Sequence, residues 1–184
     1  MNVYTKLAHD AIEKYLDKGE ILNPPGKLSD EILKNRAGIF VSIHLKNPKQ
    51  GEEDLRGCIG TFLPTKENIA LEIIDNAISA ATRDYRFSPI SKDELPNLEI
   101  SVDVLSSPEP IAINDMQYAI SKLDPQKYGV IVKTDDGRTE LLLPDLDGVN
   151  SPEEQISICR QKAGISPNEP VSLYRFKVTR HNEQ

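Results

Sequence analysis

Two stretches of alternating apolar and polar residues limit the folds open to this chain. In residues 38–46 and 98–105 almost every second side chain is apolar, which is the period of a β-strand with one face in a core. A helix would instead need apolar residues three or four positions apart. Residues 55–62 follow the first stretch after a turn-like segment, and we expect them to form a second strand. The chain is therefore expected to build a sheet.

Helical patterns lie on both sides of these strands. Residues 3–18 carry apolar side chains at helical spacing, and Gly19 is placed to end that helix. A proline-rich connector leads to a short candidate helix at residues 30–34. After the second strand, Pro64-Thr65 is expected to open a long helix that runs through Ala81. The first part of the chain thus has the order strand, strand, helix, strand.

The second half has a weaker version of the same order. Residues 129–133 and 139–143 are expected to form a hairpin around Asp136-Gly137. A helix is expected from Ser151, with Pro152 in its first turn, Glu154 completing a capping box and Gly164 beyond its end. Residues 171–179 are expected to be a final strand. The predicted class is α+β, with an N-terminal helix and a largely antiparallel or mixed sheet.

Composition excludes several classes of function. The chain has 184 residues and a net charge of −7, which argues against a nucleic-acid binder. No apolar run is long enough to span a bilayer and the N-terminus lacks the apolar core of a signal peptide, so we expect a cytoplasmic protein. The two cysteines form no CxxC pair, and no histidine has a partner at metal-ligand spacing, so neither a disulfide framework nor a metal or other cofactor is expected.

The strand Leu55-Arg56-Gly57-Cys58-Ile59-Gly60-Thr61 is the strongest candidate for a site. Side chains two apart point the same way in a strand, so Arg56 and Cys58 are expected on one face, with Cα atoms about 6–7 Å apart. At that distance a guanidinium can stabilise a thiolate. Gly57 and Gly60 suit the close approach of a ligand or of another backbone, or a bulge in the strand. The alternative is that Cys58 is only a small buried side chain.

A second cluster follows the long helix, where Arg83 and Asp84 precede Arg86. These arginines either interact with the last carbonyl groups of the helix or form a clamp for a carboxylate or phosphate, with Asp84 orienting one of them. The clamp requires the loop after the helix to fold back toward Cys58. His44 is the only histidine that a hairpin would bring near Cys58 as a base, and an exposed strand histidine is the alternative.

The sequence resembles the AMMECR-one family, whose microbial members are also called AmmeMemoRadiSam system protein A. Six segments carry the resemblance, and they extend over most of the chain. They are Leu55–Thr61, Arg83-Asp84 with Arg86-Phe87, Glu94-Leu95-Pro96, Tyr128–Val132, Leu142-Leu143-Pro144 and Lys162-Ala163-Gly164. It implies a single domain over residues 1–184, with a larger lobe of about residues 1–110 plus the C-terminal strand, and a smaller lobe of about 111–170. It also implies a cleft lined by the Cys58 strand, and no established reaction.

The family name implies partners as well. It reflects association with a Memo protein, which resembles non-haem iron dioxygenases, and with a radical S-adenosylmethionine enzyme. Both are therefore expected partners by association.

Three hypotheses follow for function. In the first, the chain is an enzyme or enzyme component in which Cys58 is a thiolate nucleophile stabilised by Arg56. An anionic small molecule or peptide is then bound by Gly57, Ile59, Gly60, Arg83, Asp84 and Arg86. In the second, the Cys58 strand and its cleft bind a protein segment, and Cys58 only packs. A redox-sensing thiol is a third hypothesis. The sequence does not determine the oligomeric state.

Overall fold

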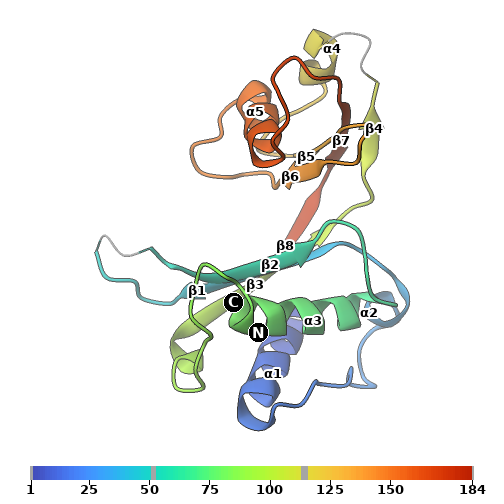
Figure 1. The fold of residues 1–184 in the computed structure, drawn as a ribbon. Coiled ribbons are helices and arrows are strands. Elements are labelled where there is room, and N and C mark those ends of the chain that lie inside the picture. The colour runs from blue at the N-terminus through green and yellow to red at the C-terminus, as the bar shows by residue number, and fades with distance from the viewer. Residues whose placement is uncertain (1, 51–52, 113–115, 184) are drawn as a thin grey trace. The chain divides into compact units, whose positions relative to one another are not determined.

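The chain forms two compact units. The structure is a computed structural model that describes residues 2–50, 53–112 and 116–183. The first unit comprises Met1–Val104 and Thr179–Gln184, and the second comprises Leu105–Val178. Each unit combines helices with a sheet of its own, so the predicted α+β class is confirmed (Figure 1).

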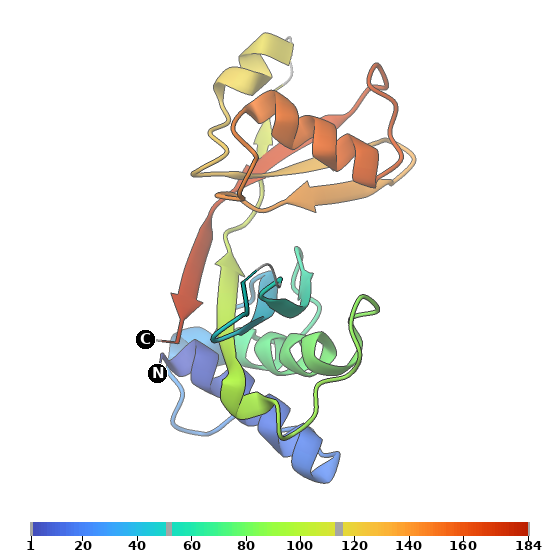
Figure 2. The same ribbon diagram turned by 90° about the vertical axis from the view of Figure 1, so that its left-hand side faces the viewer.

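The first unit contains a four-stranded sheet with the strand order β2-β1-β3-β8. Its strands are β1 (Ile39–Leu45), β2 (Leu55–Thr61), β3 (Leu98–Leu105) and β8 (Val178–Asn182). β1 pairs antiparallel with both β2 and β3, in agreement with the alternating pattern. β8 lies beside β3, as the red and yellow-green arrows in Figure 2 show. β2 is therefore an edge strand, and one side of its backbone faces away from the sheet.

Helices cover one face of this sheet. They are α1 (Val3–Lys18), α2 (Asp30–Lys34) and α3 (Ile69–Thr82), and a short 3-10 helix, η1 (Leu95–Asn97), precedes β3. α3 contacts β1 and β2, and α1 packs against α3 (Figure 1). The alternate residues Ile39, Val41 and Ile43 of β1 are fully buried. No helix among the described residues is long and apolar enough to span a membrane.

α3 begins later than the sequence predicts. We expected the helix to open at Pro64-Thr65, but its first residue is Ile69. The carboxylate of Glu72 accounts for the difference, because it accepts hydrogen bonds from the backbone N–H groups of Thr65 and Lys66 at 2.8 and 2.7 Å. Glu72 is almost completely buried, so these bonds are shielded from water. They hold the residues before the helix in a turn.

The second unit contains a four-stranded sheet with the order β4-β7-β5-β6. Its elements are β4 (Glu109–Ile111), α4 (Met116–Ser121), β5 (Gly129–Lys133), β6 (Thr139–Leu142), α5 (Pro152–Lys162) and β7 (Ser172–Phe176). The predicted hairpin between β5 and β6 and the predicted capping box of α5 are both confirmed. α5 packs against β5 and β6.

The last predicted strand, residues 171–179, is in fact two strands. β7 and β8 are separated at Lys177 and belong to different sheets. Ser106 lies beside this point, since its N–H donates to the carbonyl of Lys177 at 2.9 Å and its Oγ accepts from the N–H of Lys177 at 3.0 Å. The alternation of side chains does not reveal a change of sheet, because both strands have the same period. β4 and α4, with three and six residues, were also not expected.

Candidate functional site

The glycines of β2 allow close packing. A Cβ atom on Gly57 would lie 2.3 Å from the backbone carbonyl oxygen of Ala80, so the backbone of α3 occupies that space. A Cβ atom on Gly60 would lie 2.2 Å from Cγ of Phe40 on the neighbouring strand. The sequence offered three explanations for these glycines, namely a ligand, another backbone or a bulge, and at Gly57 the backbone of α3 is the group that comes close. At Gly60 the approaching groups are the ring of Phe40 and the backbone carbonyl oxygen of Ile39, which would lie 2.6 Å from the Cβ atom.

Cys58 lies opposite Ser42 in the β1–β2 pair. The hydroxyl of Ser42 donates a hydrogen bond to Sγ of Cys58 at 3.2 Å. Burial raises the pKa of the Cys58 thiol, and the hydrogen bond from Ser42 and the charge of Arg86 only partly offset this effect. The thiol is therefore mainly protonated at neutral pH. It is also the only cysteine of the two with part of its surface exposed, because Cys159 is buried.

The loop after α3 folds back onto the free edge of β2. Asp84 accepts a hydrogen bond from the backbone N–H of Cys58 at 2.9 Å, and Nη2 of Arg86 donates to the carbonyl of Cys58 at 3.3 Å. Asp84 and Arg86 also bind each other, with Nη2 and Oδ2 at 2.7 Å. The ion pair thus occupies both backbone groups that a further strand would otherwise pair with.

Asp84 is an acceptor for several donors at once. Its side chain is 2% exposed, and it receives hydrogen bonds from the Arg86 side chain, from the Arg86 N–H and from Cys58. The hydrogen bonds from the Arg86 guanidinium are the largest cause that lowers the pKa of Asp84 to about 2. The carboxylate is therefore charged throughout the physiological range.

Arg56 is bound to the same loop and not to the Cys58 thiol. The register between β1 and β2 passes from Gly57 to Leu55 and skips Arg56, which marks a bulge. The guanidinium bonds to Glu94, with Nε and Oε2 at 3.0 Å, and donates to the carbonyl of Ser88 at 2.8 Å. The side chain is 14% exposed. Its charge is thus compensated within the unit.

These contacts hold the segment from Arg83 to Pro89, which we call the 83–89 loop. The N–H of Ile90 donates to the carbonyl of Ala81 at 2.8 Å, which fixes the far end of the loop against α3. Arg83 caps α3 by its backbone, and its exposed side chain makes no hydrogen bond or ion pair within the part of the chain that the structure describes. Tyr85 is 95% exposed. The loop has a fixed backbone and presents these two side chains to solvent.

Several residues here were not found from the sequence. Ser42 could have been inferred, because the hairpin places it opposite Cys58, whereas Glu94 is 38 positions from Arg56 and no spacing rule connects them. His44 pairs with Asp54, with Nδ1 and Oδ2 at 3.3 Å.

A cluster on α1 was also missed. His9, Asp10 and Glu13 have potential metal-ligand atoms within 4.8 Å of one another, although the spacing of the histidines in the sequence predicted no metal site. The i and i+4 positions of His9 and Glu13 on a helix were the signal. The cluster faces solvent, and Asp10 already binds Lys6 at 2.6 Å.

Comparisons with known proteins find matches that cover almost the whole chain. The family model described as AMMECR1 matches residues 5–181. A protein of Thermotoga maritima is 49% identical over 179 residues, which cover 97% of this chain and 96% of that protein. A protein of Clostridium acetobutylicum is 45% identical over 98% of this chain, which spans only 36% of that protein. The crystal structure of an uncharacterised protein from Pyrococcus horikoshii superposes with a TM-score of 0.86 at 32% identity, covering 98% of this chain and 90% of that one.

Proposed function

The chain belongs to the AMMECR1 family, and we propose that it serves there as a binding component, which docks an acidic segment of a partner protein on the 83–89 loop. Cys58 and Arg56 then support the loop and take no part in chemistry. This is the second of the three hypotheses drawn from the sequence. The difference is the docking surface: the partner docks on the 83–89 loop, which the Cys58 strand holds, and not on the strand itself.

The exposure of Tyr85 on an anchored loop carries this proposal. A tyrosine with 95% of its surface in water contributes nothing to the core of the unit. Tyrosine and arginine dominate the binding energy of protein interfaces, because they offer a large contact area for little loss of conformational entropy. The backbone on either side of Tyr85 is held by Asp84 and Arg86. A loop ordered before binding loses less entropy when a partner docks.

Charge indicates the chemistry of the partner. Asp84 neutralises Arg86, so the exposed guanidinium of Arg83 is the surplus charge of the loop. The chain as a whole has a net charge of −7, which would repel an acidic partner over most of its surface. A cationic loop on an acidic protein favours one docking place for an acidic segment. The ring of Phe87, 5.3 Å from the Arg86 guanidinium, adds an apolar contact.

The state of the thiol supports a binding role over a nucleophile. A nucleophilic cysteine needs a lowered pKa, whereas burial raises the pKa of Cys58. Arg56, the expected stabiliser of a thiolate, is engaged by Glu94. The remaining cation beside Cys58, Arg86, contacts its carbonyl oxygen and is paired with Asp84.

The partners expected from the family name are the proteins to test. They are a Memo-like protein and a radical S-adenosylmethionine enzyme, and we propose that this chain meets them in the cytoplasm. The Clostridium acetobutylicum relative is compatible with a role as a component, because the region it shares with this chain is 36% of its length and the rest of that protein lies outside the shared region.

The test measures the affinity of this chain for the purified Memo-like protein and radical S-adenosylmethionine enzyme of the same genome by biolayer interferometry. We expect Tyr85→Ala and Arg83→Glu each to weaken binding of one of them at least tenfold. Cys58→Ala should leave the affinity unchanged. Lys27→Glu is the matched control for charge, because Lys27 is exposed and receives the same change of two units.

Three outcomes would overturn the proposal. Equal losses for Arg83→Glu and Lys27→Glu would mean that only overall charge matters. A loss in Cys58→Ala without a loss in Tyr85→Ala would favour the thiol hypothesis. Binding of neither protein would remove the assigned partners.

A further inference from the structure

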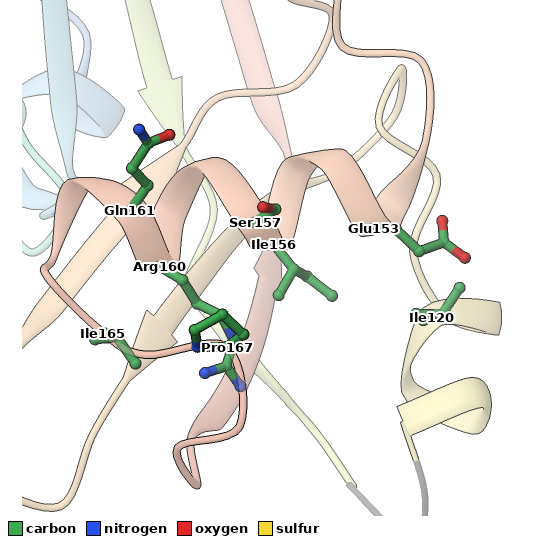
Figure 3. Close-up of a pocket in the computed structure, with 8 residues that line it drawn as sticks. All are labelled: Ile120, Glu153, Ile156, Ser157, Arg160, Gln161, Ile165 and Pro167. Carbon is green, nitrogen blue, oxygen red and sulfur yellow. The ribbon is translucent and has the colours of Figure 1, made fainter.

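A pocket in the second unit has no role in the function proposed above. It lies between α4, α5 and the segment that follows α5, and its volume is about 480 Å³ (Figure 3). Ile120 of α4, Ile156 of α5, and Ile165 and Pro167 of the following segment form its apolar lining. Pockets of about 300–1,000 Å³ with such walls are typical binding sites for small molecules.

Arg160 gives this pocket an unusual charge. It lines the pocket although the whole residue is only 8% exposed. Its Nη1 donates to the carbonyl oxygens of Ser166 and Glu169, at 2.7 and 3.0 Å. Arg160 forms no ion pair with any residue in the described ranges, and its Nε and Nη2 have no hydrogen-bond acceptor there. A nearly buried cation thus lacks a counter-charge.

The nearest acidic side chain on the same segment is already in use. The carboxylate of Glu169 forms an ion pair with Arg138 and accepts a hydrogen bond from the N–H of Ser166 at 3.2 Å. Only the backbone carbonyl of Glu169 binds Arg160. A buried charge without a partner is costly, and an anion in the pocket would remove that cost.

We infer that this pocket binds a small monocarboxylate with an apolar body, whose carboxylate pairs with the open N–H groups of Arg160. A planar guanidinium suits a carboxylate because two parallel hydrogen bonds form at once. The apolar body lies on Ile120, Ile156 and Ile165. The second carboxylate of a dicarboxylate would meet Glu153, which lines the same pocket and has no ion pair within the described part of the chain.

Figure 3 supports this placement of the two charges. Ile156 and Arg160 leave α5 toward the lower side of that view, and Glu153 extends from the other end of the helix, near Ile120. Their spacing of three and four residues places all three on one face of α5. The carboxylate end of a ligand therefore belongs at Arg160, and its uncharged end lies toward Glu153.

The test titrates the full chain, labelled with ¹⁵N, with sodium octanoate, N-acetyl-leucine and octanol, and follows the amide signals of Ile120 and Ile165. We expect saturable shifts with a carboxylate and at least tenfold weaker binding of octanol. Octanoate represents a free acid and N-acetyl-leucine represents a peptide C-terminus, so their relative affinities separate these two sources. Arg160→Gln should lower the affinity for the better carboxylate at least tenfold.

A pair of variants at another position is also needed, because Arg160 binds the carbonyl groups of Ser166 and Glu169 and its replacement could disturb the fold. Ser157 is exposed and lines the pocket, so Ser157→Phe should fill it and abolish binding, whereas Ser157→Ala should bind as the original chain does. Equal binding of octanoate and octanol, or equal binding by the two Ser157 variants, would overturn the inference.

Discussion

Two nearly buried arginines, Arg56 and Arg160, show how differently the two units use a positive charge. Arg56 lies in the segment that the sequence marks most strongly, and Glu94 and the carbonyl of Ser88 occupy its guanidinium. Arg160 lies in α5, where the sequence analysis named no candidate site residue, and it has no carboxylate partner among the described residues. The Cys58 strand thus stabilises its own loop, whereas α5 carries a charge that is available to a ligand.

A segment that stands out in a sequence is easily taken for a catalytic centre, but Arg56, Asp84 and Arg86 each have a bond within the first unit. An unpaired charge in a pocket is a more direct sign of a binding site, because its partner must come from outside.

Replacing Asp84 should have the largest effect if the first unit uses its charges for folding. Asp84→Asn removes the charge that Arg86 binds and weakens the bond from the Cys58 N–H. We expect the free energy of unfolding to fall by about 2 kcal/mol, less than for a fully buried pair because Arg86 is partly exposed. Urea denaturation at pH 7 measures the change.

The pH dependence of the same variant provides a second measurement. The pKa of Asp84 is about 2 in the folded chain and about 3.9 when unfolded. Its contribution is therefore fully present above about pH 4 and is lost as the pH falls through 2. Asp84→Asn should remove this part of the acid transition. Asp30→Asn is the control, because the exposed carboxylate of Asp30 forms an ion pair with Lys34 outside the 83–89 loop; an equal loss of stability at pH 7 would contradict the structural role of Asp84.

The two arginines can be compared directly by the same substitution. Arg56→Gln leaves the carboxylate of Glu94 without its partner, and we expect it to cost about 1.5 kcal/mol, less than Asp84→Asn because Glu94 is partly exposed. Arg160→Gln loses two hydrogen bonds to carbonyl groups but also removes an uncompensated charge, so it should cost about 1 kcal/mol or less. Urea titration of both variants without added ligand decides the order. A larger loss for Arg160 would reverse the comparison.

The smallest effect is expected at Cys58. Because burial raises the pKa of its thiol, the rate of alkylation by iodoacetamide should still increase above about pH 8.5, the value for an unperturbed thiol. Ser42→Ala should shift the curve further upward, since the hydrogen bond from Ser42 lowers the pKa. Mass spectrometry distinguishes Cys58 from Cys159. A rate that reaches its plateau near pH 6 would restore the nucleophile hypothesis.

Local patterns were sufficient for most of the fold. The alternation in β1 and β3, the stop of α1 at Gly19 and the capping box at Ser151 depend on residues within a few positions of one another, and all are confirmed. The start of α3 was wrong, because a buried carboxylate from within the helix, Glu72, binds the preceding turn. Periodicity does not contain that information.

The candidate site was harder to predict for the same reason. The sequence left open whether the loop after α3 folds back toward Cys58, and Asp84 and Arg86 do contact the backbone of Cys58. The clamp hypothesis placed the arginines around a ligand beside the thiol, but Arg86 lies with Asp84 at the backbone edge of β2. A bulge moves Arg56 out of the simple alternation, and a one-residue shift of register is invisible to a pattern of period two.

The position of β8 has a consequence for the order in which the chain can fold. This strand completes the sheet of the first unit beside β3, yet it follows the whole second unit along the chain. During synthesis on the ribosome, β1, β2 and β3 emerge first and wait for their last neighbour, while the second unit has all its strands before β8 appears. The later part of the chain is therefore able to finish folding before the earlier part does.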